Sequence, residues 1–229
     1  MVRLKNQPKL RTNLDTDFLK LIAVLSMTVD HVGGVFFPDY PVFRLIGRMA
    51  FPLFCYCMTV GLLYTHDIRR YLARLGVFAL LSQPFWILAF NADDFLGNLL
   101  NFNIFFTLFV SLLAMWGFKE HNWPLFLGCV LLLAFVNFDY SVTGVMLMLI
   151  FYLCRQIPYG WIGEVAGLAF LNCKLLGGMT IPLTLGSWTL EFPEQGLALL
   201  ALIPIWLYNG RQGAHNKAIQ YACYAFYPA

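Results

Sequence analysis

The chain has 229 residues, of which 60% are hydrophobic and only 12% are charged, and its mean hydropathy is +0.69. Soluble domains carry roughly 25% charged residues, so this composition excludes a soluble globular fold and indicates an integral membrane protein. The net charge of +3 is small, and the basic residues lie in short segments between apolar runs, which argues against a nucleic-acid partner.

The apolar runs predict an all-α, polytopic membrane bundle of about eight helices. Residues 1–16 are polar and basic and are expected to form a cytoplasmic tail, while residues 17–229 form a single transmembrane domain. About 20 apolar residues suffice to cross the hydrocarbon core. The expected helices cover about 17–37, 43–64, a third run ending near 90, then 100–118, 123–138, 142–153, 161–176 and 197–207. A long loop separates the last two, and the apolar piece 218–229 is at most a truncated ninth helix.

The loop charges predict the orientation of these helices. Basic residues gather in the tail and in every second loop, whereas the alternate loops are acidic and nearly free of Lys and Arg. By the positive-inside rule the N-terminus is cytoplasmic. Arg44 lies on the acidic, outer side against this bias, so it needs another reason to be there.

With this orientation, the polar residues inside the runs gather in the outer half of the membrane. An ionisable group in hydrocarbon is expensive, so it usually faces a protein cavity and serves a function. The candidate site residues are Asp30, His31, Arg44, Arg48, Gln83, Asn101, Asn103, Asp139, Tyr140 and Lys174.

Structural roles compete with functional ones at these positions. Asp30 and Arg48 can form a buried ion pair that only fixes helix packing, and His31 can be a hydrogen-bonded structural histidine. No metal-binding motif, phosphate loop or serine-centred elbow occurs, and the six cysteines lie mostly inside apolar runs, so we expect no bound metal. A neutral histidine near arginines suits acyl transfer, and it suits proton-coupled transport equally well.

The first 90 residues carry the most specific motifs, Asp30-His31-Val32-Gly33 and Arg44-Leu45-Ile46-Gly47-Arg48. Together with the segments 49–54, 68–75, 82–84, 138–144 and 226–228, they resemble the TraX family. TraX proteins are inner-membrane proteins linked to N-terminal acetylation of conjugative pilin, and they resemble multi-pass membrane acyltransferases. The resemblance implies acetyl-CoA as donor, Asp30 and His31 at the acyl-transfer base, and substrate-holding roles for Arg44 and Arg48.

The expected function is therefore acetyl transfer from acetyl-CoA to an acceptor amine, such as the N-terminus of a pilin or similar exported protein. His31 acts in this scheme as general base or acetyl carrier, and the protein resides in the bacterial inner membrane, surrounded by lipid. Two other classes stay open, a transporter with a polar outer-half cavity and a non-catalytic membrane partner in pilus assembly. No clear repeat relates the two halves of the chain, which weakens the transporter reading.

Overall fold

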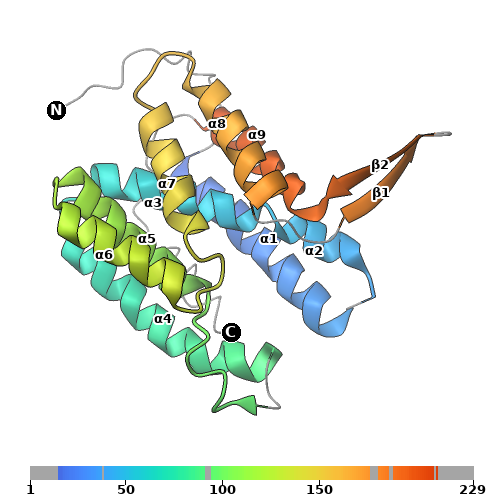
Figure 1. Cartoon of the computed structure of the whole chain (residues 1–229), viewed down its shortest axis with the longest axis horizontal. Coiled ribbons are helices and arrows are strands. Elements are labelled where there is room, and N and C mark those ends of the chain that lie inside the picture. The colour runs from blue at the N-terminus through green and yellow to red at the C-terminus, as the bar shows by residue number, and fades with distance from the viewer. Residues whose placement is uncertain are drawn as a thin grey trace. The chain divides into compact units, whose positions relative to one another are not determined.

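A computed structural model describes residues 15–37, 39–90, 94–175, 180–185, 188–208 and 210 (Figure 1). These residues fall into two compact units. The first unit holds the described residues up to 54 and those from 150 onward, and the second holds the described residues of 55–149. That the two units act as one transmembrane domain stays a prediction. The expected tail (1–14) and the expected partial helix (218–229) lie outside the described residues.

The first unit begins with α1 (Thr16–Phe36), which packs against the short helix α2 (Pro41–Gly47). Asp15 caps α1, because its Oδ1 accepts hydrogen bonds from the backbone N–H groups of Asp17 and Phe18 at 3.1 and 3.0 Å. The two helices approach closely, since a Cβ atom placed on Gly33 would overlap the side chain of Phe43.

The single helix expected over 43–64 is divided in the structure. α2 ends at Gly47, and α3 (Ala50–Tyr64) begins three residues later and continues into the second unit. Pro52 explains the break, because it has no N–H to donate to the carbonyl of Arg48 and its ring crowds that carbonyl. The interruption places Arg48 at the C-cap of α2, where the helical hydrogen-bond ladder stops.

The C-terminal part of the first unit contains α8 (Gly160–Phe170), a π-helical turn (Leu171–Leu175), a 3-10 helix (Glu194–Ala201) and α9 (Leu202–Leu207). Between the π turn and the 3-10 helix lie β1 (Thr180–Leu185) and β2 (Trp188–Pro193), which pair antiparallel with Thr180 opposite Pro193. The sequence predicted only a long loop there. The helical fold class is thus confirmed in its main part, and one two-stranded hairpin is added to it.

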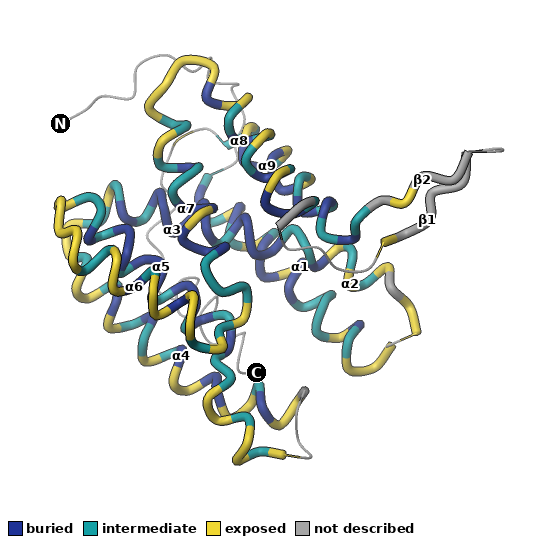
Figure 2. Tube along the Cα trace, in the orientation of Figure 1, coloured by how far each residue is buried: buried dark blue, intermediate teal, exposed yellow. Residues whose placement is uncertain are grey.

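The second unit is built from α4 (Ile68–Phe90), α5 (Ile104–Lys119) and α6 (Trp123–Phe135), which lie side by side in Figure 1. α7 (Thr143–Cys154) starts in this unit and ends in the first. Each helix has one buried and one exposed face (Figure 2), and α5 is the most buried of the three, with Leu112, Ala114 and Met115 fully covered.

Three helical segments are long and apolar enough to cross a membrane, namely Thr16–Phe36, Ile68–Ala89 and Val42–Tyr64, the last of which includes the break between α2 and α3. Shorter apolar helices cover Ile104–Lys119, Trp123–Phe135, Thr143–Cys154 and Glu194–Leu207. Large apolar side chains such as Leu80, Leu88 and Phe135 are exposed on them, as lipid-facing residues are. The chain is therefore a membrane protein, whereas the number of eight spans and the cytoplasmic N-terminus stay predictions.

Candidate functional site

In the first unit, α1 and α2 bring together four of the predicted residues, Asp30, His31, Arg44 and Arg48, which we call the Asp30 cluster. Arg44 Nε lies 3.9 Å from Asp30 Oδ1, within ion-pair range but beyond hydrogen-bonding distance. The Arg44 side chain is 44% exposed and that of Asp30 is 25% exposed. Arg44, a basic residue on the side of the predicted bundle where acidic residues prevail, therefore faces the Asp30 carboxylate across the α1–α2 contact.

Asp30 has an unusual environment for a carboxylate in an apolar helix. Its Oδ1 atom is buried, and within the described part of the chain no donor hydrogen-bonds to it. Gly47 borders it so closely that any Cβ atom there would overlap the Asp30 side chain. A buried acceptor without a donor costs about 1–3 kcal/mol, so natural proteins retain one mainly where it has a function.

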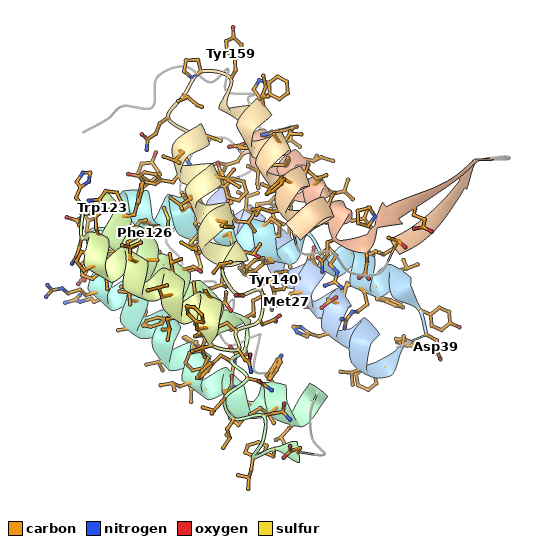
Figure 3. The ribbon with its side chains drawn as sticks, viewed as in Figure 1. Met27, Asp39, Trp123, Phe126, Tyr140 and Tyr159 are labelled. Carbon is orange, nitrogen blue, oxygen red and sulfur yellow. The ribbon has the colours of Figure 1, made fainter. Side chains whose placement is uncertain are left out.

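His31 is the second member of the pair on α1. Its ring hydrogen-bonds to the backbone of Met27, one turn earlier in the same helix, and it senses the charges of Asp30 and Arg44 (Met27 is labelled in Figure 3). The backbone contact fixes the ring relative to α1. Because successive helical residues point about 100° apart, the side chains of Asp30 and His31 leave α1 in different directions.

Arg48 has a partner that the sequence did not reveal. Its Nε and Nη2 atoms both donate to Glu194 Oε1, at 2.9 and 2.5 Å, and the two side chains are only 14% and 9% exposed. The partner lies 146 residues further along the chain, at the start of the 3-10 helix. Arg48 thus forms an ion pair with Glu194, a partner other than the Asp30 that the sequence suggested. No local pattern singles out Glu194, because Glu191 precedes it in the same acidic loop.

In the second unit, three other predicted residues form a network with Ser82, which we call the Asn103 network (Ser82, Gln83, Asn101, Asn103). Gln83 donates from Nε2 to the carbonyl of Asn101 at 2.7 Å and accepts from the backbone N–H of Asn103 at 3.1 Å. Asn103 donates from Nδ2 to Ser82 Oγ at 3.0 Å, and its Oδ1 caps α5 by accepting from Phe105 N at 2.9 Å. These side chains tie the loop before α5 to α4.

Asp139 and Tyr140 lie beside that loop. Asp139 donates its N–H to the carbonyl of Phe102 at 3.0 Å, and its own carbonyl accepts from the Thr107 hydroxyl. Tyr140 adopts a left-handed conformation with φ 61°, which turns the chain toward α7 (Figure 3). Lys174 belongs to the π-helical turn, and its side chain lies outside the described residues.

A further buried acid was missed in the first unit. Glu164 of α8 is 5% exposed and accepts a hydrogen bond from Trp206 Nε1 of α9 at 2.9 Å. Trp161 packs edge-on against Trp206 with ring centroids 6.3 Å apart. Within the described ranges, no three His, Cys, Asp or Glu side chains gather in a way that would hold a metal ion.

Comparisons with known proteins agree with the motifs. The family described as "TraX protein" matches residues 15–229. The "Probable fimbrial assembly protein FimC, serogroup H1" of Dichelobacter nodosus is 31% identical over 224 residues, which cover 92% of this chain and 90% of that protein. A 40-residue stretch is 48% identical to "Uncharacterized protein RP591" of Rickettsia prowazekii (strain Madrid E), and covers 18% of this chain and 16% of that protein. No solved structure matches. The chain belongs to the TraX family.

Proposed function

We propose that this protein is a membrane-embedded acetyltransferase that moves an acetyl group from acetyl-CoA to an acceptor amine. The observation that supports this best is the buried Asp30 oxygen without a hydrogen-bond donor among the described residues, next to His31 and Arg44. All three lie on helices at one helix–helix contact, in two segments that are each long and apolar enough to cross a membrane. Ionisable groups at such depth are kept for function more often than for stability.

Each member of the Asp30 cluster has a role in this reaction. His31 takes the proton from the acceptor amine as the nitrogen attacks the acetyl carbon, and Asp30 stabilises the imidazolium that forms. The new C–N bond replaces the C–S bond, and CoA leaves as a thiol after accepting the proton from His31. Arg44 stabilises the oxyanion that develops on the acetyl group. His31 can alternatively carry the acetyl group itself before transfer.

The relative from Dichelobacter nodosus bears on the acceptor, because its name places it in fimbrial assembly. We infer that the acceptor is the N-terminus of a pilin or a similar exported protein, and that the protein resides in the inner membrane. With a cytoplasmic N-terminus, the Asp30 cluster lies in the outer half of the membrane, where such an acceptor emerges after signal cleavage. The donor would enter from the cytoplasm.

The test is transfer of labelled acetyl groups in proteoliposomes that contain the purified protein and a peptide with a free N-terminus. We expect His31→Gln to lower the rate by about 10²–10⁴-fold, the usual contribution of a general base. His66→Gln is the matched control, because His66 is exposed in the loop before α4 and should leave the rate unchanged. A wild-type protein without transfer, or a folded His31→Gln protein at the wild-type rate, would contradict the proposal.

A second function is favoured by the name of the same relative, namely a non-catalytic membrane partner in pilus assembly. Such a partner binds a pilin and has no use for a thioester. Thermal stabilisation by acetyl-CoA separates the two, because a ligand that binds only the folded state raises the melting temperature. The enzyme should be stabilised by acetyl-CoA, whereas an assembly partner, or a transporter of another solute, should not.

A further inference from the structure

We propose that Glu194 is a positioning residue of the Asp30 cluster: it holds Arg48 away from Asp30 and so keeps the buried Oδ1 atom of Asp30 without a hydrogen-bond donor among the described residues. The activity arm of the test below rests on the proposed acetyl transfer, whereas its chemical arm does not.

The geometry of the Arg48–Glu194 pair supports a holding role. Both donors of the guanidinium, Nε and Nη2, converge on the single oxygen Oε1 of Glu194. The two side chains are only 14% and 9% exposed, so solvent weakens their attraction little. The pair also fastens the 3-10 helix to the end of α2, which contact each other within the first unit.

Asp30 competes with Glu194 for the guanidinium of Arg48. The charges of Arg48 and Glu194 both act on Asp30, so the three groups share one electrostatic neighbourhood. Gly47, the residue before Arg48, touches the Asp30 side chain, and the α2 helix ends at that point. A buried arginine that loses its acid is strongly unfavourable and will turn to the nearest remaining carboxylate. Without Glu194, we expect Arg48 to turn to Asp30, because the charges of these two residues already interact.

The two arginines of the Asp30 cluster therefore have different roles. Arg44 is 44% exposed and lies 3.9 Å from Asp30 without a hydrogen bond between them, so its guanidinium stays accessible to a substrate. The side chain of Arg48 is only 14% exposed and forms an ion pair with Glu194. If Arg48 instead bonded to Asp30, the carboxylate would be satisfied and would no longer stabilise a charged His31.

Labelling with dicyclohexylcarbodiimide tests this without an activity assay. The reagent modifies carboxyl groups in apolar surroundings and is suppressed by a guanidinium bonded to the carboxylate, and mass spectrometry of the peptide that contains Asp30 measures the yield. We expect Glu194→Gln to lower labelling of Asp30 about tenfold, as a shift of Arg48 to Asp30 in nine of ten molecules would do. The double variant Arg48→Gln/Glu194→Gln should restore labelling to within about twofold of wild type, because the arginine freed by the loss of Glu194 is then absent too, while Arg44 keeps its wild-type place.

The matched control is Asp67→Asn, which also frees an arginine, Arg70, from its acid in the loop before α4, and should leave Asp30 labelling unchanged. In the activity arm, acetyl transfer should fall in Glu194→Gln and recover in the double variant. If the Arg48–Glu194 pair only stabilises the fold, labelling of Asp30 should be equal in all variants. Acetyl transfer in the double variant should then be no higher than in Glu194→Gln. That result would overturn the proposal.

Glu194→Asp keeps the test decisive if Glu194→Gln does not fold. It retains the acid, so labelling of Asp30 should stay within about twofold of wild type. A fall as large as that expected for Glu194→Gln would contradict the proposal. Absence of acetyl transfer in every protein, with the labelling pattern intact, would reject the proposed activity and leave the role of Glu194 standing.

Discussion

The Asp30 cluster and the Asn103 network are both groups of polar side chains on apolar helices, and they differ in how their hydrogen bonds are used. In the Asn103 network, Gln83 uses both ends of its amide and Asn103 uses both of its own. In the Asp30 cluster, a buried carboxylate oxygen has no donor among the described residues, although two arginines are near. The Asn103 network stabilises a loop, whereas the Asp30 cluster keeps a carboxylate oxygen that could still accept a hydrogen bond.

This difference has an energetic meaning. A satisfied hydrogen bond contributes about 0.5–1.5 kcal/mol net, whereas a buried orphan costs about 1–3 kcal/mol. The Asn103 network is therefore expected to raise the stability of the second unit, and the Asp30 cluster to lower that of the first. Sites that sacrifice stability in this way are typical of function.

The largest expected effect is on activity at Asp30. Asp30→Asn removes the charge that stabilises an imidazolium, and we expect acetyl transfer to fall about 100-fold, equivalent to about 2.7 kcal/mol of transition-state stabilisation. The melting temperature should stay level or rise, because the carboxylate lost had no donor at its buried oxygen. Asp17→Asn, in the first turn of α1, is the control for a charge lost from the same helix. A parallel fall in stability and activity would assign Asp30 to structure.

The Asn103 network should give the opposite result. Asn103→Ala removes the cap of α5 and leaves Ser82 without its donor, so we expect a loss of about 2 kcal/mol in the free energy of unfolding. Denaturation in detergent or bilayers measures it. Asn101→Ala is the control, because Gln83 bonds to the backbone carbonyl of Asn101, which the substitution keeps. Equal stability of the two variants would contradict a structural role for the Asn103 side chain.

A third prediction concerns the close approach of α2 to Asp30. Gly47→Ala adds a Cβ atom that overlaps the Asp30 side chain, so we expect a loss of about 1 kcal/mol in stability and a measurable drop in acetyl transfer. Gly128→Ala in α6 is the matched control, since nothing lies within 4 Å of the added atom, and it should be neutral or slightly stabilising. A Gly47→Ala protein as stable and active as Gly128→Ala would show that α2 tolerates movement away from α1.

Much of the fold could be predicted from the sequence, because long apolar runs leave few alternatives to membrane helices. α1 begins and ends within a few residues of the expected bounds, α4 ends at Phe90 as expected, and α5 ends near the expected residue 118 but starts later, at Ile104. The break after Gly47 was missed, because the continuous apolar run predicted one helix over 43–64, although Pro52 cannot complete the helical ladder to Arg48. The hairpin Thr180–Pro193 was missed too, because a stretch rich in Gly and Pro is typical of loops.

The site was predictable only in part, for a physical reason. Asp30 and Arg44 are close in sequence and joined by one turn, so their meeting follows from two adjacent helices. The partner of Arg48 lies 146 residues away, and nothing local selects Glu194. Likewise, Gln83 and Asn103 look the same in sequence whether they face a substrate or each other, since an amide carries the same donors and acceptors in both cases. A substrate-binding role for them stays a prediction.

The smallest expected effect tests whether Arg44 belongs with the site or with the scaffold. Its guanidinium is 3.9 Å from Asp30 and partly exposed, so Arg44→Gln should change the free energy of unfolding by only about 0.5 kcal/mol or less. The same change should lower acetyl transfer more than it lowers stability, because oxyanion stabilisation needs the charge. Arg70→Gln, which breaks an exposed ion pair with Asp67, is the control and should alter neither. An Arg44→Gln protein that loses stability and keeps its rate would place Arg44 with the packing residues, and the Asp30 cluster would then resemble the Asn103 network.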